Sequence, residues 1–173
     1  SHLYAELHTG LWASYMTNAS GASGFWWWNL LDHKDLYGRF KALSKFAQGE
    51  DRRGKHYRSV RGRVVTSTSR ARINDTHTAP QAIMRYNKSE LFAYVYASAV
   101  NRFKTSTYTS SRTDKRLPLI EKSTLILPNS LLSGSYRLEY WDTYSGTIIR
   151  TETMTVDNNQ RAIQLLPFST DIA

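Results

Sequence analysis

Residues 24–31 read GFWWWNLL, and this aromatic run decides the fold of the N-terminal region. Consecutive side chains of a strand point to opposite faces, so the three tryptophans cannot all lie on one side. Exposing either face to water would be costly, which favours a strand that is buried on both faces. Gly24 opens the run, and the acidic turn DHKD, residues 32–35, follows it. The stretch therefore predicts a short strand enclosed between other layers.

A helix is predicted on each side of this strand. Residues 8–19, HTGLWASYMTNA, place large apolar side chains at helical spacing on one face. Residues 35–49, DLYGRFKALSKFAQG, repeat that spacing, with Asp32 as the expected N-cap and Gly49 as the expected stop. The apolar positions are Leu11, Trp12, Tyr15 and Met16 in the first helix and Leu36, Phe40, Leu43 and Ala47 in the second. The predicted order is helix, strand, helix.

The rest of the chain has a different periodicity. Short segments rich in β-branched and aromatic residues follow one another between turn residues, which is typical of an antiparallel β-sandwich. The predicted strands lie within residues 60–69, 82–86, 91–99, 123–128, 135–143, 147–156 and 162–167. Tyr144-Ser145-Gly146 suits a hairpin turn, and we expect Asp142 to cap that turn through its own backbone. The predicted fold class is α+β, with an all-β, Ig-like or jelly-roll-like sandwich after the helical region.

Composition excludes several classes of function. The 173 residues contain no cysteine, which removes disulfides, thiolate catalysis, cysteine-based zinc sites and iron–sulfur clusters. The five histidines show no metal-ligand spacing, so we expect neither a metal nor a cofactor. With 40% hydrophobic residues the chain is expected to fold despite a formal charge of +9. It has no apolar run of about 18 residues, so no membrane span is expected, and its N-terminus lacks the layout of a signal peptide.

The first fifty residues resemble the end of a cellulase-like (β/α)8 glycoside hydrolase barrel. In that group a His leads a helix of the form H-x-x-L-W-A-S, and the eighth barrel strand carries tryptophans before the closing helix. The matching residues are His8, Leu11, Trp12, Ala13, Ser14, Gly21, Gly24, Trp26, Trp27 and Trp28. The C-terminal part is similar to the small β-sandwich that follows such barrels, through EYWDTYSGTIIRTETM and LLPFSTDIA.

The resemblance implies a division of the chain into three parts. Residues 1–50 would be the end of the barrel, residues 51–63 a basic linker, and residues 64–173 the sandwich. A complete barrel needs about 250 residues, so the remainder of the barrel must come from the same precursor or from another chain. Retaining enzymes of this kind use two carboxylates about 5 Å apart. The chain would therefore be the C-terminal portion of a glycoside hydrolase acting on a polysaccharide, catalytically incomplete by itself and extracellular or secreted.

The resemblance also nominates site residues. Trp28 is the preferred platform for a sugar ring, with Trp26 next, although core packing is the alternative for each. Asn29 stands where relatives often show an Asp and would contact a ring hydroxyl. His8 would fix the helix start or contact substrate. Glu6 is the weak candidate for the seventh-strand nucleophile, against the alternative of a glutamate near a helix N-terminus.

Six cations are concentrated between the two halves. Three interpretations remain open: solvation or pairing within the protein, contact with an acidic glycan, and contact with nucleic-acid phosphate, the last being the least favoured. The residues of this basic patch are Arg52, Arg53, Lys55, Arg58, Arg61 and Arg63. Two further function classes also remain open: a non-catalytic structural or interaction subunit derived from a glycosidase, and a carbohydrate-binding β-sandwich module.

Overall fold

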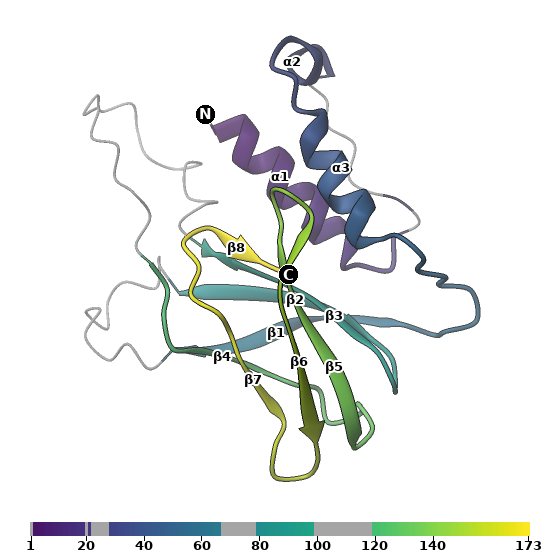
Figure 1. Cartoon of the computed structure of the whole chain (residues 1–173). Helices are drawn as coiled ribbons and strands as arrows, with labels where there is room; N and C mark the ends of the chain where they lie inside the picture. The colour runs from purple at the N-terminus through teal and green to yellow at the C-terminus, as the bar shows by residue number, and fades with distance from the viewer. Residues whose placement is uncertain (1, 20, 22–27, 67–78, 99–118) are drawn as a thin grey trace.

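A computed structural model describes residues 2–19, 21, 28–66, 79–98 and 119–173 (Figure 1). Within these described residues, three helices precede eight strands in chain order. The helices are α1 (His2–Tyr15), α2 (Trp28–His33) and α3 (Tyr37–Phe46). The strands are β1 (Arg58–Thr66), β2 (Pro80–Tyr86), β3 (Leu91–Ala97), β4 (Ser123–Ile126), β5 (Gly134–Asp142), β6 (Thr147–Val156), β7 (Ala162–Gln164) and β8 (Asp171–Ile172).

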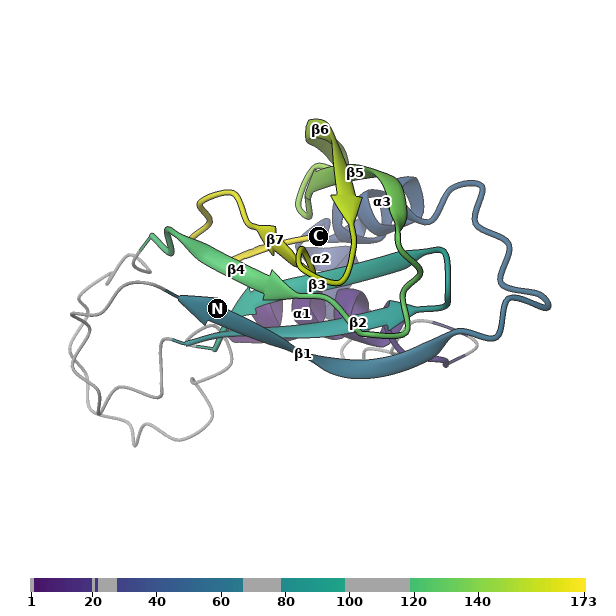
Figure 2. The same cartoon turned by 90° about the horizontal axis from the view of Figure 1, so that it is seen from below.

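The strands form two antiparallel sheets. Six strands pair in the order β7-β4-β1-β2-β3-β8, and β5 pairs with β6 in a separate hairpin. The six-stranded sheet curls, and the hairpin lies against it (Figures 1 and 2). The C-terminal segment reaches both edges of the curled sheet, because β7 pairs with β4 at one edge and β8 pairs with β3 at the other.

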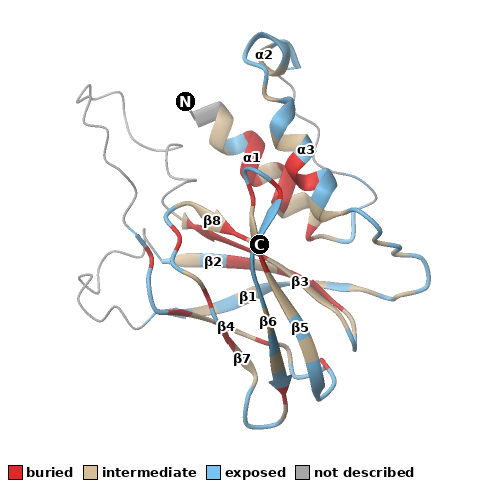
Figure 3. Cartoon of the chain, in the orientation of Figure 1, coloured by how far each residue is buried: buried red, intermediate tan, exposed pale blue. Residues whose placement is uncertain are grey.

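Strand β3 separates two apolar clusters. Its side chains alternate between faces, so Val95 and Ala97 belong to a cluster shared with the β5–β6 hairpin, whereas Tyr94 and Tyr96 belong to one shared with the helices. The helical cluster is built on α1, where Trp12 is fully buried. Figure 3 shows buried residues on α1, α3 and β3, with α2 at the far end of the helical region. The helices therefore pack directly on the sheet.

A close contact joins α3 to the turn between β5 and β6. Gly146 has a φ of +63°, and a Cβ atom built there would lie 2.6 Å from the backbone of Ala42. Asp142 Oδ1 accepts hydrogen bonds from the backbone N–H groups of Tyr144 and Ser145, at 2.9 and 2.8 Å. The predicted capping role of Asp142 is confirmed, and the capped turn can approach the helix because residue 146 has no side chain.

The fold class is confirmed at the level of antiparallel sheet combined with helices, and all seven predicted strand segments contain or overlap a strand. The prediction of a strand through residue 31 is wrong for residues 28–31, which begin α2, while residues 24–27 lie outside the described part of the chain. A lone strand would leave its backbone groups without partners, whereas a helical turn satisfies them internally. The N-cap of α3 is Leu36 and not Asp32, which lies within α2.

Two further observations concern the predicted linker and the membrane. Strand β1 begins at Arg58, so residues 58–63 of the range predicted as a linker lie in the sheet. None of the helices in the described residues has the length and apolar character needed to span a membrane.

Candidate functional site

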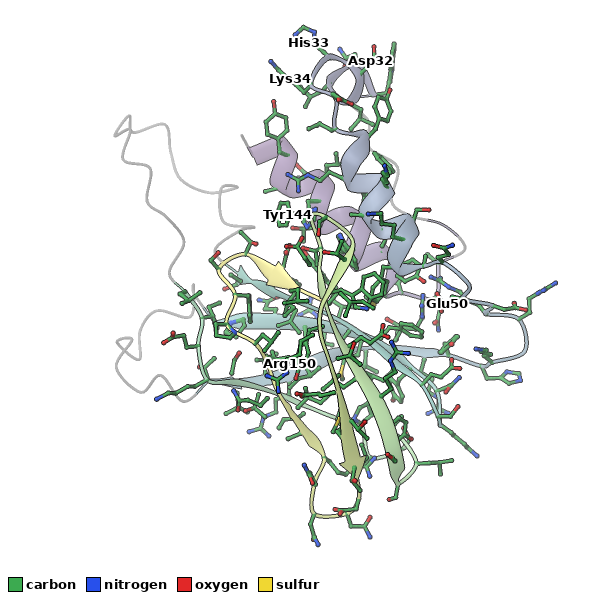
Figure 4. All side chains as sticks on the ribbon, viewed as in Figure 1. Asp32, His33, Lys34, Glu50, Tyr144 and Arg150 are labelled. Carbon is green, nitrogen blue, oxygen red and sulfur yellow. The ribbon has the colours of Figure 1, made fainter. Side chains whose placement is uncertain are left out.

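The predicted sugar platform lies on α2. Trp28 is the first residue of this helix and is 74% exposed, and Asn29 beside it is also exposed. The side-chain oxygen of Asn29 accepts a hydrogen bond of 3.0 Å from the backbone N–H of Leu30. Trp26 lies outside the described residues. In Figure 4, Asp32 and His33 of α2 and the following Lys34 lie at the end of the helical region away from the strands. The surface of α2 around Trp28 is therefore aromatic and accessible to solvent.

His8 lies elsewhere, in a buried polar cluster between α1 and the strands. Its Nε2 atom is 3.1 Å from Asp171 Oδ2 and 3.2 Å from Thr143 Oγ1. Thr143 donates to Asp171 Oδ1 at 2.5 Å, and Tyr94 donates to Asp171 Oδ2 at 2.7 Å. The ring of Tyr144, which is labelled in Figure 4, stacks on that of His8, with centroids 4.1 Å apart. Four segments distant in sequence therefore meet at one carboxylate.

This cluster contains a hydroxyl, an imidazole and a carboxylate, but its geometry is not that of a catalytic triad. A triad places the carboxylate on one ring nitrogen and the nucleophile on the other. Here Thr143 and Asp171 both face Nε2 of His8, and Nδ1 has no hydrogen-bond partner among the described residues. The side chains of His8 and Asp171 are 2% and 1% exposed. Burial and the carboxylate also raise the pKa of Tyr94, which keeps its hydroxyl protonated as a donor. The cluster holds α1 against β8.

Glu6 is exposed on α1, and within the described residues no hydrogen bond or ion pair joins it to another residue. Nor does any hydrogen bond, ion pair or ring contact in the described part of the chain join His8 to Trp28 or Asn29. The nominated residues thus occupy separate environments: the α2 surface for Trp28 and Asn29, the buried cluster for His8, and open solvent for Glu6.

Half of the basic patch is paired within the protein. Arg53 binds Asp51 at 2.9 Å, and Lys55 binds Glu90 at 2.9 Å. Arg52 lies 3.4 Å from Glu50 and also donates to the backbone oxygen of Tyr15. The other three members, Arg58, Arg61 and Arg63, are exposed along β1. The interpretation as intramolecular pairing therefore holds for three of the six cations.

A pocket that the sequence analysis did not anticipate lies where this segment meets α1 and β2. Its volume is about 600 Å³, and Arg85 forms its buried wall. Arg85 donates to the backbone oxygen of Tyr15 at 2.6 Å and pairs with Glu50 at 2.5 Å. We call this the Arg85 pocket; its lining residues are Tyr15, Asn18, Ala19, Gly21, Arg52, Gly54, His56, Tyr57 and Arg85.

Electrostatics in the Arg85 pocket favour cohesion over ligand binding. The Arg85 guanidinium lies over the rings of Tyr15, Tyr57 and Phe92, at 4.5, 5.1 and 4.8 Å. Burial, followed by the hydrogen bond to Glu50, raises the pKa of Tyr15. Glu50 contacts both arginines of the pocket, so one of their two positive charges is already compensated. The aromatic faces that a sugar would need are partly covered by guanidinium groups.

Sequence patterns gave only a faint signal for Arg85. It interrupts the apolar residues of β2, between Met84 and Tyr86, and both of these neighbours are buried. A cation in such a position requires a buried acceptor, but the sequence does not indicate which of the 14 acidic residues provides it.

The described residues contain no group of three His, Asp or Glu side chains placed to hold a metal ion. Comparisons with protein-family models, with curated proteins and with solved structures find no match to this chain.

Proposed function

We propose that this chain is the C-terminal portion of a glycoside hydrolase that acts on a polysaccharide by a retaining mechanism, and that it is catalytically incomplete by itself. The proposal assigns α1 and α3 to the last helices of a (β/α)8 barrel and the eight strands to the appended β-sandwich. It is supported by the resemblance of the Trp-rich N-terminal block and of the hairpin after Trp141 to that family. The proposed setting is extracellular.

The observation that carries the proposal is the exposure of α2. None of its six residues, all of them described, is buried, although the helix contains Trp28, Leu30 and Leu31. Tyr37, which follows shortly after, is 52% exposed. A tryptophan that is 74% exposed forgoes the stabilisation of about 2 kcal/mol or more that burial of a large apolar side chain provides. Exposed apolar surface of this kind marks a contact site for protein or ligand.

The proposal assigns the catalytic carboxylates and the sugar-contacting residues to different parts of the enzyme. Retaining hydrolysis needs two carboxylates about 5 Å apart, one as nucleophile and one as acid/base. In the described residues Glu6 has no carboxylate partner, so the proposal places both catalytic groups in the missing part of the barrel. Trp28 supplies an aromatic face for a sugar ring at the site that the missing part completes, and the Asn29 amide supplies hydrogen bonds to ring hydroxyls.

The decisive experiment extends the chain at its N-terminus. The protein encoded by the reading frame upstream of Ser1 is expressed together with residues 1–173, and release of reducing sugar is measured on a panel of polysaccharides. We expect hydrolysis by the extended protein and none by residues 1–173 alone. Replacing either of two upstream glutamates by Gln should abolish it. An upstream sequence without a partial barrel, or an extended protein with no activity on any glycan, would overturn the proposal.

A second experiment tests the exposed face of α2 directly. Sedimentation velocity of residues 1–173 should show concentration-dependent association, and Trp28→Ser should reduce it. The matched control is Ile149→Ser, which removes a side chain that is 55% exposed on β6. A chain that stays monomeric at all concentrations, or equal effects of the two substitutions, would count against a covered surface at α2. Salt-insensitive glycan binding by the isolated chain, lost in Trp28→Ser, would instead favour a carbohydrate-binding module.

A further inference from the structure

The three exposed arginines of β1 do not share one face of the six-stranded sheet. Side chains of a strand alternate between its two faces, so Arg61 and Arg63 lie on one face and Arg58 on the other. Gly62 shares the face of Arg58, and a Cβ atom built on Gly62 would lie 2.8 Å from Ala82 Cβ, in the cluster shared with the hairpin. Arg61 and Arg63 therefore lie on the opposite face, which carries the helices.

The helical region covers only part of that face. Ser59 at the start of β1 donates to the backbone oxygen of Met16 at 2.8 Å, just after the end of α1. Further along β1, Arg61, Arg63 and Val65 are all exposed, and Figure 3 shows exposed residues along this strand. The face is thus open from the middle of β1 onwards, within the described part of the chain.

This open part of the face carries positive charge that the described residues leave uncompensated. Among those residues, no hydrogen bond or ion pair joins Arg61 or Arg63 to a partner. Asp171 is the one carboxylate that the described strands place on this face, and its side chain is 1% exposed and bound to His8. Residues two apart on a strand are separated by about 6.7 Å, so the two guanidinium groups form a short row.

An amide side chain lies on the same face. Gln81 of β2 is exposed, and its Oε1 atom accepts a hydrogen bond of 3.0 Å from the Tyr96 hydroxyl. Burial raises the pKa of Tyr96, and the nearby charge of Arg61 opposes this in part, so the hydroxyl stays protonated as a donor. The N–H groups of the Gln81 amide are therefore left to donate to a ligand. Two guanidinium groups and one amide make a donor set that suits carboxylates and sugar hydroxyls.

We propose that this surface, formed by Arg61, Arg63 and Gln81, binds an acidic polysaccharide through its carboxylate groups. The inference rests on the proposed function for the polysaccharide and deepens it by naming the class of glycan. A planar guanidinium binds a carboxylate through two parallel N–H groups, which a neutral sugar cannot match. Of the three interpretations of the basic patch, contact with an acidic glycan thus applies to this pair of arginines.

The same surface offers nucleic acid only contacts to its phosphates. Proteins that bind single strands combine cations with exposed aromatic rings on which the bases stack. The described strands place three aromatic residues on this face, and none offers a free ring. Tyr94 and Tyr96 are 0% and 8% exposed, and Phe92 packs edge-on against Phe46. A glycan, which needs charge and hydrogen bonds more than stacking, therefore fits the surface better than nucleic acid.

The test measures binding of polygalacturonate to residues 1–173 by isothermal titration calorimetry. The double variant Arg61→Gln/Arg63→Gln should bind about tenfold more weakly, and its affinity should depend less steeply on salt between about 50 and 200 mM. The matched control is Arg58→Gln/Lys88→Gln, which removes two exposed charges outside this surface and should change the affinity less than about twofold. All four cations are exposed, so circular dichroism and the Tm should show both variants folded.

Three results would overturn the proposal. One is an equal loss of affinity in the two double variants, which would mean that net charge alone attracts the polymer. Another is binding of single-stranded poly(dT) as tightly as polygalacturonate, which would make the surface a general polyanion site. The third is hydrolysis of neutral polysaccharides only by the extended protein, which would contradict this inference while supporting the proposed function. Binding to polygalacturonate should also be unchanged in Trp28→Ser, so a failure at α2 and a failure at β1 are distinguishable.

Discussion

Helices α1 and α2 lie in the same N-terminal region, yet only α1 has a buried apolar face. Leu11 and Trp12 of α1 are at most 1% exposed, whereas α2 buries none of its residues, all of which the structure describes. The difference is not one of composition, since each helix carries a tryptophan and leucines. The contrast shows which apolar surfaces are buried within this chain and which remain exposed for contact with another molecule or segment.

Contacts in the middle and at the C-terminal end of α1 explain its position. The aromatic rings of Tyr94 and Phe46 enclose Trp12, with centroids 5.9 and 5.0 Å from it. The His8 cluster binds its middle to β8, and the Arg85 pocket binds its C-terminal end to β2. Helix α2 has no comparable set of contacts in the described residues. Substitutions at these points test how strongly α1 and its surroundings are held.

The largest effect is expected at the tryptophans themselves. Trp12→Ala removes a fully buried indole and leaves a cavity, so it should lower the free energy of unfolding by about 3–5 kcal/mol. Trp28→Ala, on a residue that is 74% exposed, should change it by less than about 0.5 kcal/mol. Urea unfolding followed by circular dichroism measures both. Equal losses would mean that α2 is packed as α1 is, and the comparison between the two helices would fail.

The next largest effect is expected in the His8 cluster. Asp171→Asn replaces a buried carboxylate that accepts three hydrogen bonds. The new amide group would point its N–H bonds at side chains that are themselves donors, so the substitution should lower the free energy of unfolding by about 2–4 kcal/mol. The matched control is Asp157→Asn, since Asp157 accepts from the N–H groups of Asn159 and Gln160 in a turn where Asn serves as well. A cost below about 1 kcal/mol at Asp171 would show that the cluster does not hold α1 to β8.

How far these contacts were predictable depends on their range in the sequence. The apolar faces of the helices and the positions of the strands follow from local periodicity, as does the Asp142 turn. The pairs His8–Asp171 and Arg85–Glu50 join residues far apart in the chain, and periodicity carries no information on such partners. Residues 28–31 were misassigned because a short apolar run fits a strand and a helix equally well. The secondary structure of such a run depends on what packs against it, which its local sequence does not specify.

A smaller effect is expected where the β5–β6 turn meets α3. Gly146→Ala introduces a Cβ atom 2.6 Å from the backbone of Ala42 at a residue with positive φ, so it should cost about 2 kcal/mol. The contrasting variant is Gly10→Ala within α1, where no atom beyond the adjacent residues and the surrounding helix backbone lies within 4 Å of the added Cβ. There the gain in helix propensity should stabilise the protein by about 0.5–1 kcal/mol. Tm shifts of opposite sign test the pair, and a neutral Gly146→Ala would refute the close contact.

The smallest effect is expected at Glu90, beside the Arg85 pocket. The hydrogen bond from Tyr57, with the ammonium of Lys55, lowers the pKa of Glu90 in the folded protein. A lowered folded pKa means that the carboxylate stabilises the fold above its unfolded pKa of about 4.3 and loses that contribution as the pH falls through the folded pKa. The side chain is 38% exposed, so solvent screening limits the effect, and Glu90→Gln should cost less than about 1 kcal/mol at pH 7.

The difference between wild type and Glu90→Gln should shrink as the pH is lowered from 7 to about 3, because the unfolded carboxyl gains its proton in this range and the advantage of the lowered folded pKa declines. Glu121→Gln makes the same change of charge at an exposed glutamate of the strand region and should have no effect at either pH. Urea midpoints for the three proteins across this range measure the difference. A cost at Glu90 that persists at pH 3 would mean that packing and not charge carries its contribution, and that the segment before β1 is held to the sheet by shape alone.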